Sequence, residues 1–475
     1  MYKSYKASDY QIEKIQSIIS LPSAIVKDFQ KNLKNHPPKF KINDSLAYFF
    51  LNLVALRGFE DPDSNELFEG FVPLYSGILK SYSRDYKMYF DYFVETGLLE
   101  KLNYSTAKKR SNAYKFASDR IDVNNDFLRV NLHKLAKSSK FKIVEQFDGR
   151  DINCEHLVPL FYNGLSIDFD NAIKEIMKEQ NFHKRNAQLL AIEKIRNKEF
   201  WFKRNVLSDN RLHTPLTNLS KLTRQFFYIN GESMVNIDIK CSQPYFLVGM
   251  IDEIKREETE RNATNTLMLH NIDEIRHIVD LISFKEEYSK IKDWILYDDF
   301  YTRMSDSLFE GKEISLERTE IIGKKKNAKC KKVIYRNVRD LVKKLVLRMF
   351  YINPDCRVYK GDKDIKLFTE KFPEFSKLLV ALKKQDYKKF SMMMQQREAY
   401  CILDVVTKRL AQSYPDMPLV TIHDSIATTV SWAKRLNLGE LIQTMMFEEN
   451  GVRPQISVEA WNNVELTAEG KADIF

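Results

Sequence analysis

The apolar pattern of the N-terminal part of the chain separates a helical arm from a compact domain. Residues 1–40 carry a helical pattern that ends at Pro37 and Pro38, because proline cannot continue a helix interior. We therefore predict a helical arm over residues 1–40 and a separate domain over residues 41–125.

Two helical patterns open this second domain. The first begins at Asp44 or Ser45, either of which can cap a helix, and the second stops at Gly97. Two short apolar runs, at 98–104 and 113–116, then flank the polar, basic tip STAKKRSN. This order predicts two helices followed by a β-hairpin.

Residues 126–205 have mostly polar helical patterns, which predict a helical connector. Cys154, Glu155 and His156 come nearest to a metal-ligand cluster in this region. No second pair of ligands follows at a spacing that zinc sites use, so we assign these residues no chemistry.

Two carboxylates lie at the ends of apolar strand patterns in the C-terminal part of the chain. The alternating pattern over 234–239 contains Asp238 and is followed by a helical pattern from Ser242. In MPLVTIHDSIATTV, two apolar runs flank a tight turn that contains Asp424. A charge in such a setting is costly unless it is paired or bound to a metal. A turn-capping role explains either aspartate alone, but a cationic segment between them favours a shared function.

That cationic segment has a helical spacing of its own. Residues 324–348 contain eleven basic residues and one acidic residue, a composition that usually forms a solvated helix face. Four residues in and just after this segment are spaced by four: Arg339, Lys343, Leu347 and Tyr351. They line one side of the predicted helix, where two cations, an apolar residue and an aromatic ring fit a triphosphate followed by its sugar and base.

Composition excludes several classes of protein. The 475 residues include 75 Lys and Arg against 65 Asp and Glu, a formal net charge of +10, and 44% apolar residues. This apolar content can fill extended cores, which argues against a disordered or fibrous chain. With only 14 Gly and no P-loop or G-x-G-x-x-G pattern, a Gly-rich nucleotide cradle is not predicted. The charge permits a polyanionic partner.

The same sequence favours a cytoplasmic protein without a membrane partner. Five cysteines without a C-x-x-C pair suit a reducing compartment. The N-terminus lacks the apolar core of a signal peptide, and the longest apolar stretch, Leu46–Leu56, is too short to span a bilayer and contains Asn52.

The order of the C-terminal features resembles motifs A, B and C of the superfamily of family A DNA polymerases and single-subunit phage-type RNA polymerases. The matching residues are Asp238-x-x-x-Ser242, then Arg339-x-x-x-Lys343 with Tyr351, then His423-Asp424-Ser425. The resemblance covers residues 206–475. It implies an α+β fold in the form of a right-hand polymerase: palm and fingers over 206–475, a thumb-like connector over 126–205, and the mostly helical N-terminal domain before them.

This resemblance assigns roles to individual residues. Asp238 and Asp424, together with the carbonyl of Ile239, would hold two Mg²⁺ ions, or Mn²⁺ in their place, for phosphoryl transfer to a 3′-hydroxyl. Arg339, Lys343, Leu347 and Tyr351 would bind the nucleoside triphosphate. His423 would join the catalytic set by supporting the primer end; a turn histidine that is bonded locally is the alternative.

Nucleic-acid contacts are implied at two further places. The segment RLHTPLTNLSKLTRQFF is similar to the one that grips template and primer, which makes Arg211 and Arg224 candidate phosphate contacts. The helix–helix–hairpin order of residues 41–125 resembles a winged helix, in which a helix enters a DNA groove and a basic wing touches phosphates. The groove candidates are Ser83, Arg84 and Lys87, and the wing candidates are Lys108, Lys109 and Arg110. A solvated hairpin without a nucleic-acid role is the alternative.

The sequence contains conflicting indications of the sugar. The HDS triplet and the D-x-x-x-S spacing look like RNA polymerases, whereas Gln243 falls where DNA polymerases carry Glu and RNA polymerases carry Gly. A side chain packed against the C2′ position excludes a 2′-hydroxyl by clash, so we favour deoxynucleotides. Ile352 also departs from the family, in which Gly follows the tyrosine of motif B.

These observations predict a DNA-directed DNA polymerase that takes part in replication of a phage or other mobile element, in a bacterial or virus-infected cell. Its partners would be DNA template and primer, nucleoside triphosphates and other replication proteins. An RNA polymerase or primase is the first alternative. A non-enzymatic winged-helix initiator with a degenerate palm is the second, against which the intact Asp238, Lys343 and Asp424 argue.

Overall fold

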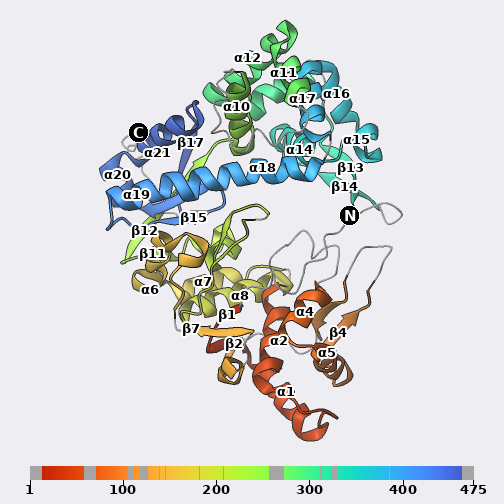
Figure 1. Cartoon of the computed structure of the whole chain (residues 1–475), viewed down its shortest axis with the longest axis vertical. Helices are drawn as coiled ribbons and strands as arrows, with labels where there is room; N and C mark the ends of the chain where they lie inside the picture. The colour runs from red at the N-terminus through yellow and green to blue at the C-terminus, as the bar shows by residue number, and fades with distance from the viewer. Residues whose placement is uncertain are drawn as a thin grey trace. The chain divides into compact units, whose positions relative to one another are not determined.

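The protein is described from a computed structural model, in which helices and strands are both abundant (Figure 1). The structure describes residues 13–57, 71–104, 111–117, 127–137, 140–144, 146–180, 182–206, 208–255, 272–310, 313–322, 329–384 and 386–462. Among the helices in these ranges, none has both the length and the apolar character that crossing a bilayer requires.

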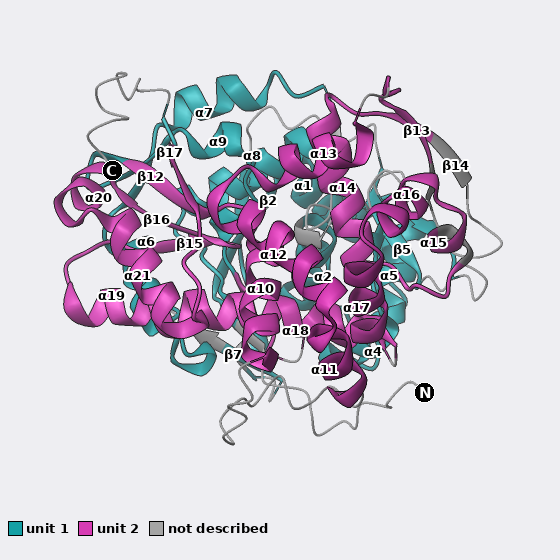
Figure 2. Ribbon diagram, turned by 90° about the horizontal axis from the view of Figure 1, so that it is seen from above, with its two compact units in different colours: residues 1–203, 213–233, 461–463 teal, residues 204–212, 234–460, 464–475 magenta. Residues whose placement is uncertain are grey.

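The chain forms two compact units, coloured separately in Figure 2. Unit 1 contains residues 1–203, 213–233 and 461–463, and unit 2 contains residues 204–212, 234–460 and 464–475. The four-part division expected from the sequence is finer than these two units and stays a prediction.

Unit 1 is built from short helices and small sheets. Its main helices are α1 (Ser23–Asn35), α2 (Asp44–Arg57), α4 (Ser76–Tyr82), α5 (Tyr86–Glu95), α6 (Pro159–Asn163), α7 (Phe169–Ile176), α8 (Phe182–Arg196) and α9 (Lys221–Arg224). Its strands are β1 (Glu13–Gln16), β2 (Ile18–Pro22), β3 (Val72–Pro73), β4 (Leu99–Leu102), β5 (Ala113–Phe116), β6 (Phe127–Asn131), β7 (Phe141–Val144), β8 (Leu165–Ile167) and β11 (Phe227–Ile229).

The prediction of a helical arm is wrong for its first described residues. Residues 13–22 form β1, which pairs in parallel with β7, and β2, which pairs antiparallel with β6. The isoleucines of this segment are β-branched and therefore favour a strand, and the helix begins only after Pro22. The predicted connector over 126–205 likewise contains strands as well as helices.

The predicted hairpin is confirmed as β4 and β5, which pair antiparallel and form a three-stranded sheet in the order β3-β5-β4. The expected single helix before it is two helices, α4 and α5. Gly97 ends the second at φ +69°, in the left-handed region that glycine adopts without strain.

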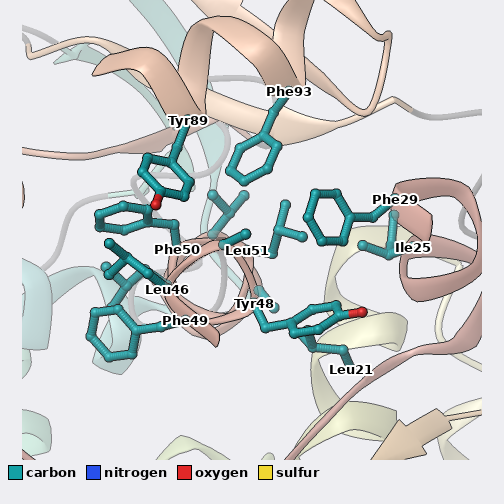
Figure 3. Packing of buried hydrophobic residues seen from close by; sticks show 14 of the residues in the cluster. Leu21, Ile25, Phe29, Leu46, Tyr48, Phe49, Phe50, Leu51, Tyr89 and Phe93 are labelled. Atoms are coloured by element: carbon teal, nitrogen blue, oxygen red, sulfur yellow. The ribbon is translucent and has the colours of Figure 1, made fainter. Parts of the chain in front are cut away.

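Helix α2 is the centre of the unit 1 core. Its residues from Ser45 to Ala55 are all buried, because the sequence is apolar on every side of the helix. Figure 3 looks along this helix and shows Leu46, Phe49 and Phe50 pointing out from it in different directions, with Tyr89 against Phe50. The rings of Phe50 and Tyr89 meet edge to face at 5.4 Å.

One polar residue, Asn52, interrupts this apolar helix and has a specific partner. Lys194 of α8 is buried and donates from Nζ to Asn52 Oδ1 at 2.7 Å. Burial lowers the pKa of Lys194 to about 8, although the charge of Glu199 opposes the shift. The hydrogen bond to Asn52 therefore offsets part of the free-energy cost of burying the Lys194 side chain in unit 1.

Unit 2 combines an antiparallel sheet with a large set of helices. The sheet contains β12 (Glu232–Ile239, whose first two residues belong to unit 1), β15 (Val420–Ile422), β16 (Ser425–Thr429) and β17 (Ile456–Ala460). The helices are α10 (Ser242–Lys255), α11 (Ile272–Asp280), α12 (Ile282–Tyr297), α13 (Phe300–Phe309), α14 (Val338–Tyr351), α15 (Arg357–Gly361), α16 (Lys363–Lys371), α17 (Pro373–Lys383), α18 (Tyr387–Ala399), α19 (Thr407–Ser413), α20 (Val430–Leu436) and α21 (Leu438–Asn450). Figure 1 shows α18 and α19 as one long rod, joined by the π-helical turn Tyr400–Val406.

The predicted basic helix is shorter than the sequence pattern suggested. Helix α14 begins at Val338, where the side chain of Asn337 accepts the backbone N–H of Asp340 at 2.8 Å. Before it, β13 (Glu317–Ile322) and β14 (Lys329–Ile334) form a hairpin. Closely spaced lysines repel one another on a helix, whereas here Lys332 lies 2.7 Å from Glu317 across the ladder. Residues 324–328 lie outside the described residues.

We expect the buried Lys194 to give unit 1 a pH-dependent stability. Between pH 8 and 10.5 the unfolded chain binds a proton at this lysine that the folded chain has lost, so the free energy of unfolding rises with pH. For wild type relative to Lys194→Met, the rise should be about 3 kcal/mol. Denaturant titrations at pH 7.5, 9 and 10 measure it, with the exposed Lys174→Met as control. Parallel pH profiles of wild type and Lys194→Met would contradict this role.

Candidate active site

The two predicted aspartates meet at one end of the unit 2 sheet. Strand β12 lies between β16 and β17, so Asp238 stands directly opposite Ser425 on one side and Ser457 on the other. Asp424 occupies the two-residue turn immediately before Ser425, between β15 and β16. The sheet register therefore brings two carboxylates, 186 positions apart in the chain, to adjacent positions.

The surroundings of the two aspartates disfavour their negative charges. Burial and then the charge of Asp424 raise the pKa of Asp238 to about 7, while Lys343 opposes the shift. Burial also raises the pKa of Asp424, and a backbone hydrogen bond, Arg211 and Lys343 oppose the shift. Within the described part of the chain, no side chain donates a hydrogen bond to either carboxylate. Two such carboxylates have the oxygen donors that a hard divalent cation prefers.

The donor set for such a cation is incomplete by itself. Among the described residues, no group of three or more His, Cys, Asp or Glu side chains gathers as a metal site would require. Two aspartates therefore fit a cation that takes its remaining oxygens from water or from a bound phosphate. The predicted third contribution, the carbonyl of Ile239, comes from a buried residue that pairs with Ile456; its role as a ligand stays a prediction.

His423 is the other residue of the turn and is exposed. Its φ of +56° lies in the left-handed region, which is uncommon outside glycine and in which histidine is among the more frequent exceptions. The turn closes through Ser425, whose Oγ donates to the carbonyl oxygen of Ile422 at 2.8 Å. The geometry fixes the ring at the tip of the hairpin, and its catalytic role stays a prediction.

Helix α14 presents its two predicted cations to one aromatic ring. The guanidinium of Arg339 lies 5.3 Å from the centre of the Tyr301 ring, and the ammonium of Lys343 lies 5.9 Å from the same centre. Arg339 also donates from Nε to Asp299 at 3.0 Å. Asp299 and Tyr301 were missed by sequence reasoning, although Asp299 follows a common signal, since it caps α13 by accepting the N–H of Thr302.

The far end of α14 is tied to α10 through a chain of hydrogen bonds. Tyr351 donates from its hydroxyl to Gln243 Oε1 at 2.7 Å, and Gln243 donates from Nε2 to Glu398 Oε2 at 2.5 Å. Ser242 Oγ donates to the same Glu398 oxygen at 2.5 Å. Leu347 lies on α14 one turn before Tyr351 and is half-buried. The predicted sugar-contacting residue Gln243 is thus held in place by two partners.

Glu398 is a further residue of this site that sequence reasoning missed. It is fully buried in α18, and Arg211 donates to its Oε1 from Nε at 2.9 Å and from Nη2 as well. Burial raises the pKa of Glu398 and the charge of Arg211 opposes the rise. The signal was available, because Glu398 interrupts an apolar helical stripe between Met394 and Ile402. Arg211, predicted as a phosphate contact, has two of its three nitrogens engaged by Glu398; the phosphate contact stays a prediction.

The departure at Ile352 has a physical explanation. Ile352 follows α14 in an extended conformation, so no left-handed glycine ends this helix. Lys383 of α17 instead donates from its buried Nζ to the carbonyl oxygens of Met349 and, at 3.1 Å, of Ile352. A cation at the last carbonyls stabilises a helix C-terminus. Lys383 thereby holds the turn that carries Tyr351.

The remaining nucleic-acid candidates belong to unit 1. Arg224 donates to the carbonyl of Leu219 at 3.2 Å, and its guanidinium lies 6.0 Å from the ring centre of Trp461. Three candidates lie between and on α4 and α5: Ser83, Arg84 and Lys87, of which the last two are exposed. The wing candidates Lys108, Lys109 and Arg110 lie outside the described residues. No nucleic-acid contact of these residues is tested by the structure.

Comparison with known proteins gives similarity to solved structures and to no known family. No protein-family model matches the sequence, and no curated protein does. Among solved structures, the chain is similar to the POL domain of Pol1 from M. smegmatis in complex with DNA primer-template and dNTP, at 11% sequence identity and a TM-score of 0.39. The match covers 59% of this chain and 52% of that structure, so the chain spans about half the length of the structure it matches.

We expect Lys383→Met to destabilise unit 2. The substitution removes the donor from the buried Met349 carbonyl and from the half-buried Ile352 carbonyl, which costs about 2 kcal/mol and lowers the Tm by about 5 °C. Thermal unfolding measures the shift, and Lys384→Met, the exposed neighbour, is the control. An unchanged Tm in Lys383→Met would show that this ammonium is not needed to end α14.

Proposed function

We propose that the protein is a template-dependent nucleotidyltransferase, most specifically a DNA-directed DNA polymerase. The observation that carries the proposal is the convergence in unit 2 of Asp238 and Asp424 with the cationic face of α14. Lys343 acts electrostatically on both aspartates, and Tyr301, which both α14 cations approach, is itself influenced by Asp424. Carboxylates for a metal and cations for a polyphosphate therefore belong to one site.

The residues divide the work of phosphoryl transfer among them. Asp238 and Asp424 would hold two Mg²⁺ ions, which would supply the charge neutralisation that the attacking 3′-oxygen and the leaving pyrophosphate need. Lys343 and Arg339 hold the triphosphate, and the Tyr301 ring keeps both cations on the same side of α14. Positioning and electrostatics are what this reaction requires of a protein, because little covalent chemistry is involved.

The sugar and base would lie against the other end of α14. Tyr351 stacks at the nascent base pair, and Gln243, bonded to its hydroxyl, faces the ribose. A side chain fixed at both ends of its amide resists displacement, so a 2′-hydroxyl meets a rigid obstacle and deoxynucleotides are favoured. RNA synthesis is the alternative, favoured by Ser425 in the place where DNA polymerases of this type carry Glu.

Unit 1 would bring the enzyme to DNA. The element order α2-β3-α4-α5-β4-β5 with the sheet order β3-β5-β4 supports a winged-helix module, and Arg84 and Lys87 are exposed where its groove helix begins. A role in replication of a phage or other mobile element, in the cytoplasm of a bacterial or infected cell, follows from this combination of a DNA-binding module and a polymerase.

Asp424→Asn should abolish metal-dependent primer extension. Loss of one of two metal-binding carboxylates removes several kcal/mol of transition-state stabilisation, so the rate should fall by more than about 100-fold. A labelled primer–template with Mg²⁺, and dNTPs or NTPs in separate reactions, measures it. Asp416→Asn, an exposed aspartate on the same approach to β15, is the control. Equal extension by wild type and Asp424→Asn would remove this aspartate from the mechanism, and DNA binding without any extension would favour the non-enzymatic initiator.

Gln243→Gly should shift the enzyme toward ribonucleotides. Removing the side chain opens the space for a 2′-hydroxyl, and the ratio of dNTP to NTP efficiency should fall about tenfold or more. Single-nucleotide incorporation with each sugar measures this ratio. The Tyr351→Phe variant keeps the Gln243 side chain and removes only the hydroxyl that donates to it, so the dNTP/NTP ratio of this variant should change less. An unchanged ratio in Gln243→Gly would defeat the steric argument.

A further inference from the structure

Each side chain that is hydrogen-bonded to the Glu398 carboxylate donates to it. Arg211 donates from two nitrogens, Ser242 donates from its hydroxyl and Gln243 from its amide nitrogen. This set matches an ionised carboxylate, which is an acceptor at every lone pair and has no proton to give. Because Glu398 is saturated by these groups and has no exposed surface, its oxygens are not available to a metal.

The ionised Glu398 determines which way the amide of Gln243 points. Only the NH₂ end can face a carboxylate, so the carbonyl end must face Tyr351, whose hydroxyl donates to it at 2.7 Å. The chain of donors thus runs in one direction, from Tyr351 through Gln243 to Glu398. Glu398, which would not touch the sugar, therefore sets the orientation of Gln243, which would face it.

The same contact explains why residue 243 is Gln. A glutamate there would place a second carboxylate at hydrogen-bond distance from Glu398, and two like charges so close cannot both stay ionised without a large penalty. Glutamine has nearly the same shape and supplies the proton that the contact needs. The DNA polymerases that the sequence resembles carry a negative charge at this position, whereas here the charge lies on α18, where Arg211 compensates it.

We propose that Glu398 is the positioning residue for sugar selection: it carries the charge displaced from residue 243 and orients Gln243 and, through it, Tyr351. The proposal rests on the proposed polymerase function. It makes residues 243 and 398 a reciprocal pair, in which one member must be the acid and the other the amide. Exchange of the two should preserve the hydrogen-bonded contacts, with the Ser242 hydroxyl accepting from the new amide at position 398 where it now donates to Glu398. An amide at position 398 can donate to a carboxylate at position 243 and still accept from Arg211, while that carboxylate accepts from Tyr351.

The test is a double-mutant cycle in the full-length protein with Gln243→Glu, Glu398→Gln and the exchanged double variant. Each single variant should lower the Tm by about 5 °C, and the double variant should return to within about 2 °C of wild type. Efficiency of dNTP extension should fall about tenfold or more in each single variant and recover in the double variant to within about threefold. The dNTP/NTP ratio should fall in Glu398→Gln and recover in the double variant, which loss of structural support alone does not predict.

A matched pair of exposed residues, Gln412→Glu with Glu370→Gln, makes the same changes of charge and should leave Tm and the dNTP/NTP ratio unchanged. If Glu398→Gln does not fold, recovery of folding in the double variant supports the pairing, and failure of both overturns it. If wild type extends primers but the Tm losses of the two single variants add in the double variant, the inference is overturned and the proposed function is unaffected. Absence of extension by wild type with either sugar contradicts the proposed function itself.

Discussion

The energetic cost of burying carboxylates governs the arrangement of unit 2. Three acids, Asp238, Asp424 and Glu398, lie close together there: the charge of Asp424 raises the pKa of the other two, and that of Glu398 raises the pKa of Asp238. Only Glu398 is matched by an adequate set of donors among the residues that the structure describes. The two aspartates have Lys343 as a common opposing charge, and in the proposed function metal ions would compensate them further. Under the proposed function, Glu398 would support the site and the two aspartates would act in it.

Helix α14 is held at both ends by contacts that involve cations. At its start, Arg339 and Lys343 share the face of Tyr301, which keeps two like charges close without burying either. At its end, Lys383 replaces the glycine that would normally turn the chain. The helix is thereby fixed as a rigid support, and the four residues that the sequence spaced by four keep a common face.

How much of this was predictable depends on whether the signal was local. Asp238 and Asp424 were found because each interrupts an apolar strand pattern, and the sheet register then brings them together. The hairpin of β13 and β14 was not predicted, because a run of lysines also fits an exposed helix face. Cross-strand pairing decides the structure of such a run. Glu398 and Lys383 were missed because their partners lie far away in sequence and on other elements. Such contacts depend on tertiary packing that spacing alone does not encode.

Polar residues inside apolar helices divide into two kinds by what they touch. Asn52 accepts a hydrogen bond from Lys194 within the core of unit 1. Glu398 instead joins three segments, and the chain of donors that ends on it begins at Tyr351, a residue of the cationic helix. A buried charge that only stabilises needs one partner, and it is often replaceable by an apolar side chain. A buried charge that sets the direction of a hydrogen-bond chain is not replaceable in this way. Its capacity to accept and not to donate hydrogen bonds, and not its volume, fixes the orientation of the residues beyond it.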